Sequence, residues 1–311
     1  MNDAYTTRME HFADRLAAAV RSKKTPLCVG LDPRWEQLPL VLRQRHDGST
    51  LEGVAAAYEA FCHRVLDIVA PLVGVVKPQA AFFEACGPAG FLALASLQRR
   101  ARELGLVTIL DAKRNDIAST AQAYADAAFA GTVVDGGRRP VWQADALTIN
   151  PYLGRDAVEP FLVSARAAGA GVFVLVRTSN KGAGLFQDLM CEGKPVYEHV
   201  GAAVSAWSRE HRGACGFGDV GAVVGATHPR ELARLRAVMP ETIFLVPGYG
   251  AQGGSAADCA AAFRDDGLGA VVNSSRGITA CFKPDDPNWE KAIENATRVT
   301  NADLAAVTHL R

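Results

Sequence analysis

Eight short apolar runs recur along the chain, and each one ends in a polar residue or a glycine. Inside a run the apolar residues follow one another without alternating with polar ones, as in VFVLV and AVVGA. Strands of this kind are buried on both faces, which is typical of a parallel sheet covered by helices. The runs span residues 26–32, 74–79, 107–113, 146–152, 172–179, 222–228, 243–250 and 270–276.

Ala- and Leu-rich stretches with a helical pattern separate these runs, and eight such units predict a (β/α)8 TIM barrel. We expect a single domain over residues 1–311, with an amphipathic helix within residues 1–21 and a helix that closes the chain. Insertions are expected near 33–50 and 182–195. An open doubly wound sheet is the alternative, and the number of units disfavours it. The expected helices between the runs span residues 54–69, 88–104, 117–130, 157–168, 200–210, 229–238 and 255–264.

Charge and cysteine content narrow the class of protein. The chain has 33 Lys plus Arg and 33 Asp plus Glu, so it lacks the basic excess that nucleic-acid or membrane-surface binding requires. Seven widely spaced cysteines and no Cys-x-x-Cys indicate free thiols in a reducing compartment. The seven histidines show no local metal-binding spacing. We therefore expect a cytoplasmic protein with no metal, nucleic-acid partner or membrane span.

Charged residues gather at the end of the third run. Asp111 and Lys113 are two residues apart, so both side chains should leave the same face of the strand. Asp116 is expected to cap the following helix, with Thr120 four residues later on the same helical face. Lys77 ends the preceding run and should lie on the neighbouring strand. Since active sites of (β/α)8 barrels form at the C-terminal ends of strands, this cluster is the predicted catalytic site.

The alternative interpretation of the cluster is a structural salt-bridge network followed by an ordinary helix cap. Burying alternating Lys and Asp side chains is costly unless each charge is paired, and apolar replacements are often neutral or stabilising. A network of this kind at a strand end therefore favours a functional role.

Asp111-Ala-Lys113-Arg-Asn-Asp116-Ile resembles the signature of the orotidine 5′-phosphate decarboxylases. The Asp-x-Lys-x-x-Asp pattern alone is shared with sugar-phosphate decarboxylases and synthases on the same barrel. The stretches around Asp32 and Lys77 also resemble the first and second strands of the family, and 247–254 and 273–277 resemble its last two loops. Together these matches resemble the bacterial branch with longer loops, the type 2 subfamily.

This resemblance implies a charged tetrad of Lys77, Asp111, Lys113 and Asp116 and no cofactor. Lys113 would donate a proton to C6 of the pyrimidine, and Asp111 would lie beside the departing carboxylate. Asp116 would come from the partner subunit of a homodimer, with Thr120 beside it.

The resemblance also implies how the nucleotide is held. Asp32 and Lys77 would bind ribose hydroxyls, Ser179 the pyrimidine edge, and Gln252 both the pyrimidine and the phosphate. The other expected contacts are Arg276 and the backbone near Gly253 and Gly277 for the phosphate, and Tyr249 in the loop. Asn150 either orients a lysine of the tetrad or only ends its strand.

Gly248-Tyr-Gly250-Ala-Gln-Gly253 formally satisfies the dinucleotide-binding pattern Gly-x-Gly-x-x-Gly. Only one strand follows it, and that strand ends in Ser274-Ser-Arg276 without the acidic residue that such a domain needs. The loop is therefore interpreted as part of a phosphate site on a barrel.

The sequence predicts a carboxy-lyase that converts orotidine 5′-monophosphate to uridine 5′-monophosphate and CO₂ in pyrimidine biosynthesis. One alternative is a Mg²⁺-dependent sugar-phosphate decarboxylase on the same barrel. The other is a protein that binds a nucleotide phosphate without catalysis.

Overall fold

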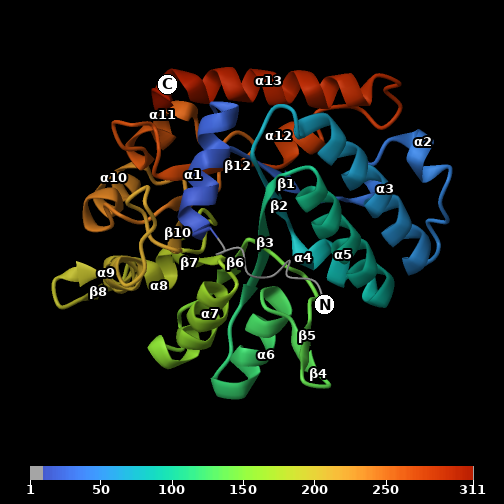
Figure 1. Ribbon diagram of the computed structural model, residues 1–311. Helices are drawn as coiled ribbons and strands as arrows, with labels where there is room; N and C mark the ends of the chain where they lie inside the picture. The colour runs from blue at the N-terminus through green and yellow to red at the C-terminus, as the bar shows by residue number, and fades with distance from the viewer. Residues whose placement is uncertain (1–9, 311) are drawn as a thin grey trace.

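The computed structural model describes residues 10–310, and its centre is a closed parallel barrel (Figure 1). The predicted (β/α)8 fold is confirmed, and each of the eight predicted runs overlaps one barrel strand. Strand ends differ from the prediction by a few residues, mainly because the polar C-terminal residues of each run leave the sheet as loops. In barrel order the strands are β1 (Leu27–Leu31), β12 (Ala270–Ser274), β11 (Phe244–Val246), β10 (Val220–Val224), β7 (Gly171–Arg177), β6 (Ala146–Ile149), β3 (Val107–Arg114) and β2 (Val75–Pro78).

Helices surround the barrel and cover the outer face of the sheet (Figure 1). The predicted helices form, except that the one expected over 255–264 is only α11 (Ala256–Cys259) followed by a 3₁₀ turn (Ala260–Ala262). The main helices are α3 (Leu51–Val69), α5 (Gly87–Glu103), α6 (Ala118–Ala128), α7 (Arg155–Ala167), α9 (Val196–Arg209), α10 (Pro229–Val238) and the closing helix α13 (Trp289–Thr308). Two short helices, α4 (Ala80–Glu84) and α12 (Arg276–Thr279), follow β2 and β12.

Helix α1 (Phe12–Lys23) closes the floor of the barrel, which is the end where the strands begin. Phe12, Leu16 and Val20 are the predicted apolar face of this helix, and all three are buried. The ring of Phe12 packs edge-on against Phe173 of β7, with 6.0 Å between centroids. The predicted amphipathic helix is thus confirmed from residue 12, and the part expected over 1–9 lies outside the described residues.

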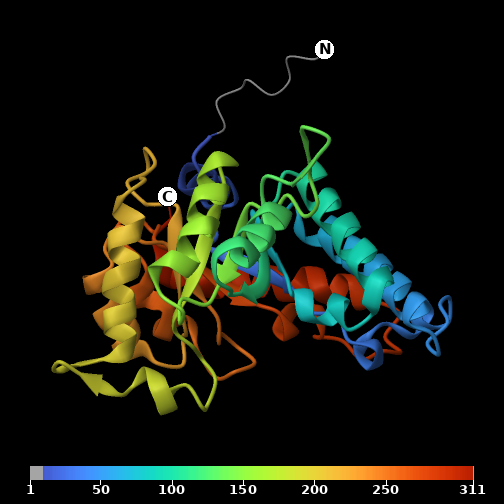
Figure 2. The same cartoon turned by 90° about the horizontal axis from the view of Figure 1, so that it is seen from below.

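Both predicted insertions carry short elements of their own. The insertion at 33–50 contains a 3₁₀ turn (Trp35–Gln37) and helix α2 (Leu40–Arg43). The insertion at 182–195 contains helix α8 (Gly184–Gln187) and the hairpin of β8 (Met190–Cys191) and β9 (Lys194–Pro195). Figure 2 shows the second insertion and helix α1 at opposite ends of the molecule.

A hairpin of β4 (Thr132–Val134) and β5 (Gly137–Arg139) follows α6 and was not predicted. Its turn residues Asp135 and Gly136 have φ of 50° and 71°. An Asp-Gly pair with two positive φ angles is the usual signal of a tight hairpin, so this element could have been found from the sequence.

Over residues 10–310, no helix is both long enough and apolar enough to cross a bilayer. The seven cysteines are free thiols.

Candidate active site

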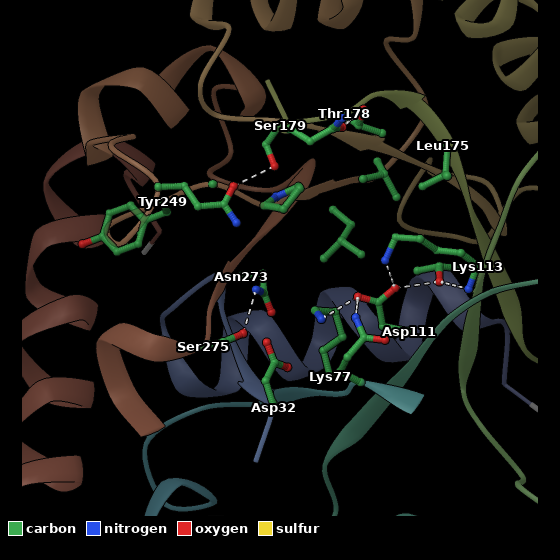
Figure 3. Close-up of a pocket in the computed structure, with 18 of the residues that line it drawn as sticks. Asp32, Lys77, Asp111, Lys113, Leu175, Thr178, Ser179, Tyr249, Asn273 and Ser275 are labelled. Atoms are coloured by element: carbon green, nitrogen blue, oxygen red, sulfur yellow. Dashed lines mark hydrogen bonds and ion pairs between the residues drawn. The ribbon is translucent and has the colours of Figure 1, made fainter. Parts of the chain in front are cut away.

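A cavity of about 490 Å³ opens at the C-terminal ends of the barrel strands, within the size range of small-molecule sites (Figure 3). Every barrel strand, or the loop that directly follows it, contributes lining residues to this cavity. Of the predicted site residues, the cavity lining includes Asp32, Lys77, Asp111, Lys113, Ser179, Tyr249, Gln252 and Arg276.

Asp111 lies at the centre of a hydrogen-bonded network on one wall of the cavity (Figure 3). Its Oδ2 accepts from Lys77 Nζ at 2.7 Å and from Gln79 Nε2 at 2.9 Å. Its Oδ1 accepts from Lys113 Nζ at 2.6 Å and from Thr148 Oγ1 at 2.9 Å. Lys77 and Asp111 are only 4% and 6% exposed. A buried carboxylate with four donors and two flanking ammonium groups is the arrangement that makes burial of these charges tolerable.

The network shifts the pKa values of Asp111 and Lys77 in the directions that favour their charged forms. Burial alone would raise the pKa of Asp111, but the charges and hydrogen bonds of Lys77 and Lys113 outweigh it and hold that pKa well below its usual range. Burial would likewise lower the pKa of Lys77, but Asp111 and Asp32 outweigh it and raise that pKa above its usual range. Strongly perturbed groups in a cleft are typical of catalytic sites.

Lys113 reaches Asp111 by a route that strand alternation did not predict. Its backbone is left-handed, with φ of 48°, and the pairing of β3 with β6 is irregular between Leu110 and Arg114. The hydroxyl of Thr148 on β6 holds this segment, because it accepts from the amides of Ala112 at 3.1 Å and Lys113 at 2.9 Å. The predicted contact between Asp111 and Lys113 is present, but the local backbone turn produces it, not a regular strand.

Asp116 and Thr120 lie outside the cavity of the described chain. The prediction that Asp116 caps the next helix is wrong, because α6 begins at Ala118 and Ile117 occupies the N-cap position. The Asp116 carboxylate instead accepts from the adjacent amide of Ile117 at 2.8 Å. The extended backbone of Ile117 moves the helix start one residue along, so Asp116 and Thr120 do not share a helical turn.

On the wall formed by β1 and β12, two buried oxygens face the cavity without a partner. Asp32 Oδ1 and Asn273 Oδ1 have no hydrogen-bond partner among residues 10–310, and both side chains line the cavity. Ser275 fits beside them because Gly30 of β1 has no side chain; a Cβ there would stand 1.8 Å from Ser275 Oγ. Buried acceptors of this kind are the usual partners of ligand hydroxyl groups.

The opposite wall is formed by the loops after β7 and β11. Ser179 Oγ donates to Gln252 Oε1 at 2.9 Å (Figure 3). The Tyr249 hydroxyl is turned away from Asp111 and donates to Asp303 of α13. Gly248 has φ of 98°, and a Cβ there would stand 3.2 Å from the Cβ of Ser179. The glycine thus allows the two loops to approach closely.

Of the residues predicted to bind a phosphate, Gln252 and Arg276 line the cavity, whereas Gly253 and Gly277 follow them in the chain and are not among the lining residues of the described chain. Arg276 lines the cavity with an exposed guanidinium at the start of α12. Gly253 has φ of 98°, and both Gly253 and Gly277 are exposed. At the start of helix α11, Ser255 and Asp258 form a capping box that already pairs the backbone amides of these two residues.

Comparisons with known proteins place these features in a family. Residues 25–286 match the model of the orotidine 5′-phosphate decarboxylase / HUMPS family. The chain belongs to this family. Its predicted resemblance to the orotidine 5′-phosphate decarboxylases is confirmed.

Relatives in the family are similar over nearly their whole length. The chain is 49% identical to orotidine 5′-phosphate decarboxylase from Rhodopirellula baltica, over 95% of this chain and 99% of the relative. It is 39% identical to the enzyme of the same name from Caldicellulosiruptor bescii, over 88% and 91%. Among solved structures, the OMP decarboxylase of Leishmania donovani matches with a TM-score of 0.74 and 35% identity, over 96% of this chain and 99% of that one.

Asn150 and His228 play local roles in this orotidine 5′-phosphate decarboxylase family member. Asn150 Oδ1 accepts from the amide of Tyr152 at 3.0 Å, which ends the strand and turns the chain. His228 occupies the N-cap of α10 without a side-chain cap bond among the described residues. Neither residue lines the cavity of the described chain.

Sequence reasoning missed several lining residues. Thr148 and Gln79 donate hydrogen bonds to Asp111. In the described part of the chain, Asn273 presents an oxygen without a hydrogen-bond partner. Gln187 of α8 accepts from the amide of Thr178 at 3.0 Å and brings the 182–195 insertion to the cavity. For Gln79 and Thr148 a signal existed, since each is a polar residue near the end of an apolar run.

Proposed function

We propose that this chain is a carboxy-lyase that converts orotidine 5′-monophosphate to uridine 5′-monophosphate and CO₂ in pyrimidine biosynthesis. The observation that carries the proposal is the ion-paired array in which the buried Lys77 and Asp111 meet the more exposed Lys113 in the cavity of a family member. Relatives that match almost end to end bear the name of this activity.

The array fits the charge that develops in the reaction. As the bond from C6 to the carboxylate breaks, its electron pair stays on C6 and CO₂ departs. The Lys113 ammonium, fixed against Asp111 at 2.6 Å, stabilises that carbanion and transfers its proton from Nζ to C6. Water then returns a proton to Lys113. A cation that interacts more strongly with the transition state than with the substrate accelerates the chemical step.

Asp111 would act on the substrate side of the same step. A carboxylate held ionised beside the substrate carboxylate repels it, and the repulsion disappears as CO₂ leaves. At about 4 Å and an effective dielectric of about 20, one such pair is worth about 4 kcal/mol. Contacts of the remote phosphate with Arg276 and Gln252 would supply the binding energy that holds the two carboxylates together.

The ribose would lie between the two described walls. Asp32 carries a buried oxygen without a partner in the described chain, and Lys77 lies near it in the same cavity (Figure 3). A ribose hydroxyl donates to such an oxygen and accepts from an ammonium group. Ser179 and Gln252 on the opposite wall would then face the pyrimidine.

Decarboxylation of orotidine 5′-monophosphate, followed by its loss of absorbance, tests the proposal. Lys113→Ala should lower kcat/KM by at least about 10²–10⁴-fold, the usual range for a general acid. Lys291→Ala removes an exposed lysine of α13 and should leave the rate unchanged. Wild-type protein that does not decarboxylate this nucleotide contradicts the proposal, and decarboxylation of it that survives EDTA rejects the alternative of a Mg²⁺-dependent sugar-phosphate decarboxylase.

We further infer that two copies of the chain complete each other's sites. Asp116 and Thr120 are at least partly exposed and lie outside the cavity of their own chain. Apolar residues around them are exposed too: Ile117 at 56% and, in the neighbouring loop after β6, Tyr152 at 86%. An apolar surface around polar residues is typical of a protein interface. Docked against a second copy, it would carry Asp116 and Thr120 to the partner's cavity.

Mixing two inactive variants tests this arrangement. Dimers that combine a Lys113→Ala chain with an Asp116→Ala chain contain one site with both residues intact if Asp116 acts across the interface. Random exchange makes half of the dimers mixed, so about a quarter of wild-type activity should return. If Asp116 acts within its own chain, no intact site forms and the mixture stays inactive.

The free cysteines support a cytoplasmic location for this activity. Five of the seven are at least partly buried, and Cys191 and Cys281 are exposed as free thiols. Exposed thiols persist in a reducing compartment.

A further inference from the structure

Two histidines and a buried carboxylate meet at the floor of the barrel, the end opposite the cavity. His11 precedes α1, His211 follows α9 and Asp219 directly precedes β10. His11 Nε2 is 3.0 Å from His211 Nδ1, which is 2.8 Å from Asp219 Oδ2. All three atoms lie within 4.8 Å of one another. The histidines are 200 residues apart, so no local spacing in the sequence could reveal them.

The segments that carry these residues are well fixed. The Asp14 carboxylate of α1 accepts from the amides of Ala214 at 2.9 Å and Cys215 at 2.7 Å. Helix α1 and the loop between α9 and β10 lie at the same end of the molecule (Figure 2). The convergence is therefore built into the packing of α1 against the barrel floor.

No assignment of protons to these three side chains turns all of their short contacts into hydrogen bonds. His11 Nδ1 accepts from the amide of Ala13 at 3.1 Å, so a neutral His11 carries its proton on Nε2 and donates it to His211 Nδ1. The contact with Asp219 requires His211 Nδ1 to carry a proton and donate it. One nitrogen cannot do both, so the three short contacts are incompatible in every protonation state that keeps the Ala13 contact.

Asp219 has spare ligand capacity. Its side chain is 4% exposed, and its Oδ1 has no hydrogen-bond partner among residues 10–310. A buried carboxylate oxygen without a donor is costly unless a ligand completes it. The unpartnered oxygen is an observation independent of the two imidazoles, and it shows that this carboxylate can take a further positively charged partner.

We propose that His11, His211 and Asp219 form a binding site for one divalent transition-metal ion of the zinc class. Two imidazole nitrogens and a carboxylate oxygen are ligands that Zn²⁺ prefers, and Mg²⁺ or Ca²⁺ would require more oxygen ligands. Metal–ligand bonds of about 2.0–2.1 Å separate neighbouring ligand atoms by about 3.3 Å in a tetrahedral site. The two contacts of His211, at 3.0 Å and 2.8 Å, are within tenths of an ångström of that spacing, and the third pair lies within 4.8 Å. Water would complete the coordination.

A bound ion removes the conflict over the proton on His211 Nδ1. The two imidazole nitrogens and the Asp219 oxygen then all donate electron pairs to the metal, and none of them has to donate a proton to another. A metal-bound neutral His11 carries its proton on Nδ1, so it releases the amide of Ala13 to solvent. Arg166 Nε donates to Asp219 Oδ2 at 3.0 Å and so helps to orient the carboxylate. The charge of Arg166 is shared with Glu210, and Asp14 adds a second carboxylate to the site's surroundings.

The ion would fasten α1 to the loop before β10. Its ligands lie at the strand starts and the catalytic cavity at the strand ends, so its removal should change stability and not the decarboxylation rate. The proposal is therefore independent of the proposed activity.

Isothermal titration of the EDTA-treated, desalted chain with ZnCl₂ tests the site. We expect one more high-affinity equivalent in the wild type than in His211→Ala, or at least about tenfold weaker binding in the variant, which corresponds to 1.4 kcal/mol. Excess Zn²⁺ should raise the melting temperature of the wild type and not of His211→Ala.

Two further variants make the outcome decisive. His46→Ala removes a histidine of the 33–50 insertion and should bind Zn²⁺ as the wild type does. His211→Gln keeps an amide donor for Asp219 and replaces His211→Ala if that variant does not fold. Equal stoichiometry and affinity in the wild type and the His211 variant, including binding only to the exposed thiols of Cys191 and Cys281, overturns the proposal.

Discussion

Replacing Thr148 with valine tests whether a hydroxyl on β6 holds the proton donor in place. The substitution keeps the shape of a fully buried side chain but removes its contacts with Asp111 and with the amides of Ala112 and Lys113. The left-handed backbone of Lys113 costs about 1–2 kcal/mol relative to the ordinary conformations of an L-residue. Without the hydroxyl, the segment can relax by that amount.

The size of the effect follows from this strain. A relaxation of about 1–2 kcal/mol lowers the population with Lys113 in place by about 5–30-fold, and we expect kcat to fall by the same factor. The variant also loses a buried hydrogen bond to the Asp111 carboxylate and the acceptor for two backbone amides. These losses should lower the free energy of unfolding by about 2–4 kcal/mol. Both quantities are measurable, the first by loss of nucleotide absorbance and the second by urea denaturation.

Thr108→Val is the matched control. Thr108 is fully buried on β3, and its hydroxyl donates to Asp145 at 3.2 Å at the opposite end of the barrel. This variant should lose stability and keep its kcat. A Thr148→Val enzyme with the kcat of the wild type, or an equal loss of kcat in Thr108→Val, refutes the positioning role.

Three other changes probe the network and the loops. Because the folded pKa of Asp111 is depressed below its usual 3.8 and that of Lys77 is raised above its usual 10.5, the stability they contribute should be constant from about pH 5 to about pH 9. This contribution to stability should fall below about pH 4, because Asp111 becomes protonated there. The urea midpoint of the wild type should then drop toward that of Asp111→Asn. Midpoints of the two proteins that change in parallel with pH contradict this. Gly248→Ala places a Cβ at φ of 98° in close contact with the loop after β7, and steady-state kinetics should show a raised KM. Arg177 donates to Gln187 Oε1 at 3.1 Å from a buried position, so Arg177→Met should release the 182–195 insertion and raise KM more than it lowers kcat, whereas an unchanged KM contradicts a role of the insertion at the cavity.

The strands could be predicted because each is encoded by its own residues. A buried parallel strand needs a continuous apolar run, and that requirement is local in the sequence. The charged residues at the ends of the runs could be found for the same reason. Helix starts were less accurate, as at Asp116, because one extended residue at Ile117 shifts the helix start without altering the pattern.

Contacts between distant segments could not be predicted from patterns along the chain. The hydroxyl of Thr148 supports Lys113 from a neighbouring strand, and the register irregularity that brings them together has no sequence signal known to us. His11 and His211 meet only because α1 closes the barrel floor. Such positions depend on three-dimensional packing, and a single sequence does not encode them as a periodic pattern.

The left-handed turn at Lys113 has a consequence for protein engineering. Glycine or asparagine would adopt that backbone at low cost, yet neither carries an ammonium group. Grafting Asp-x-Lys-x-x-Asp onto the strand of another barrel therefore copies the sequence motif without the backbone conformation that it needs. The recipient also needs a buried hydroxyl on the adjacent strand, placed as Thr148 is here, before the grafted lysine can face the substrate.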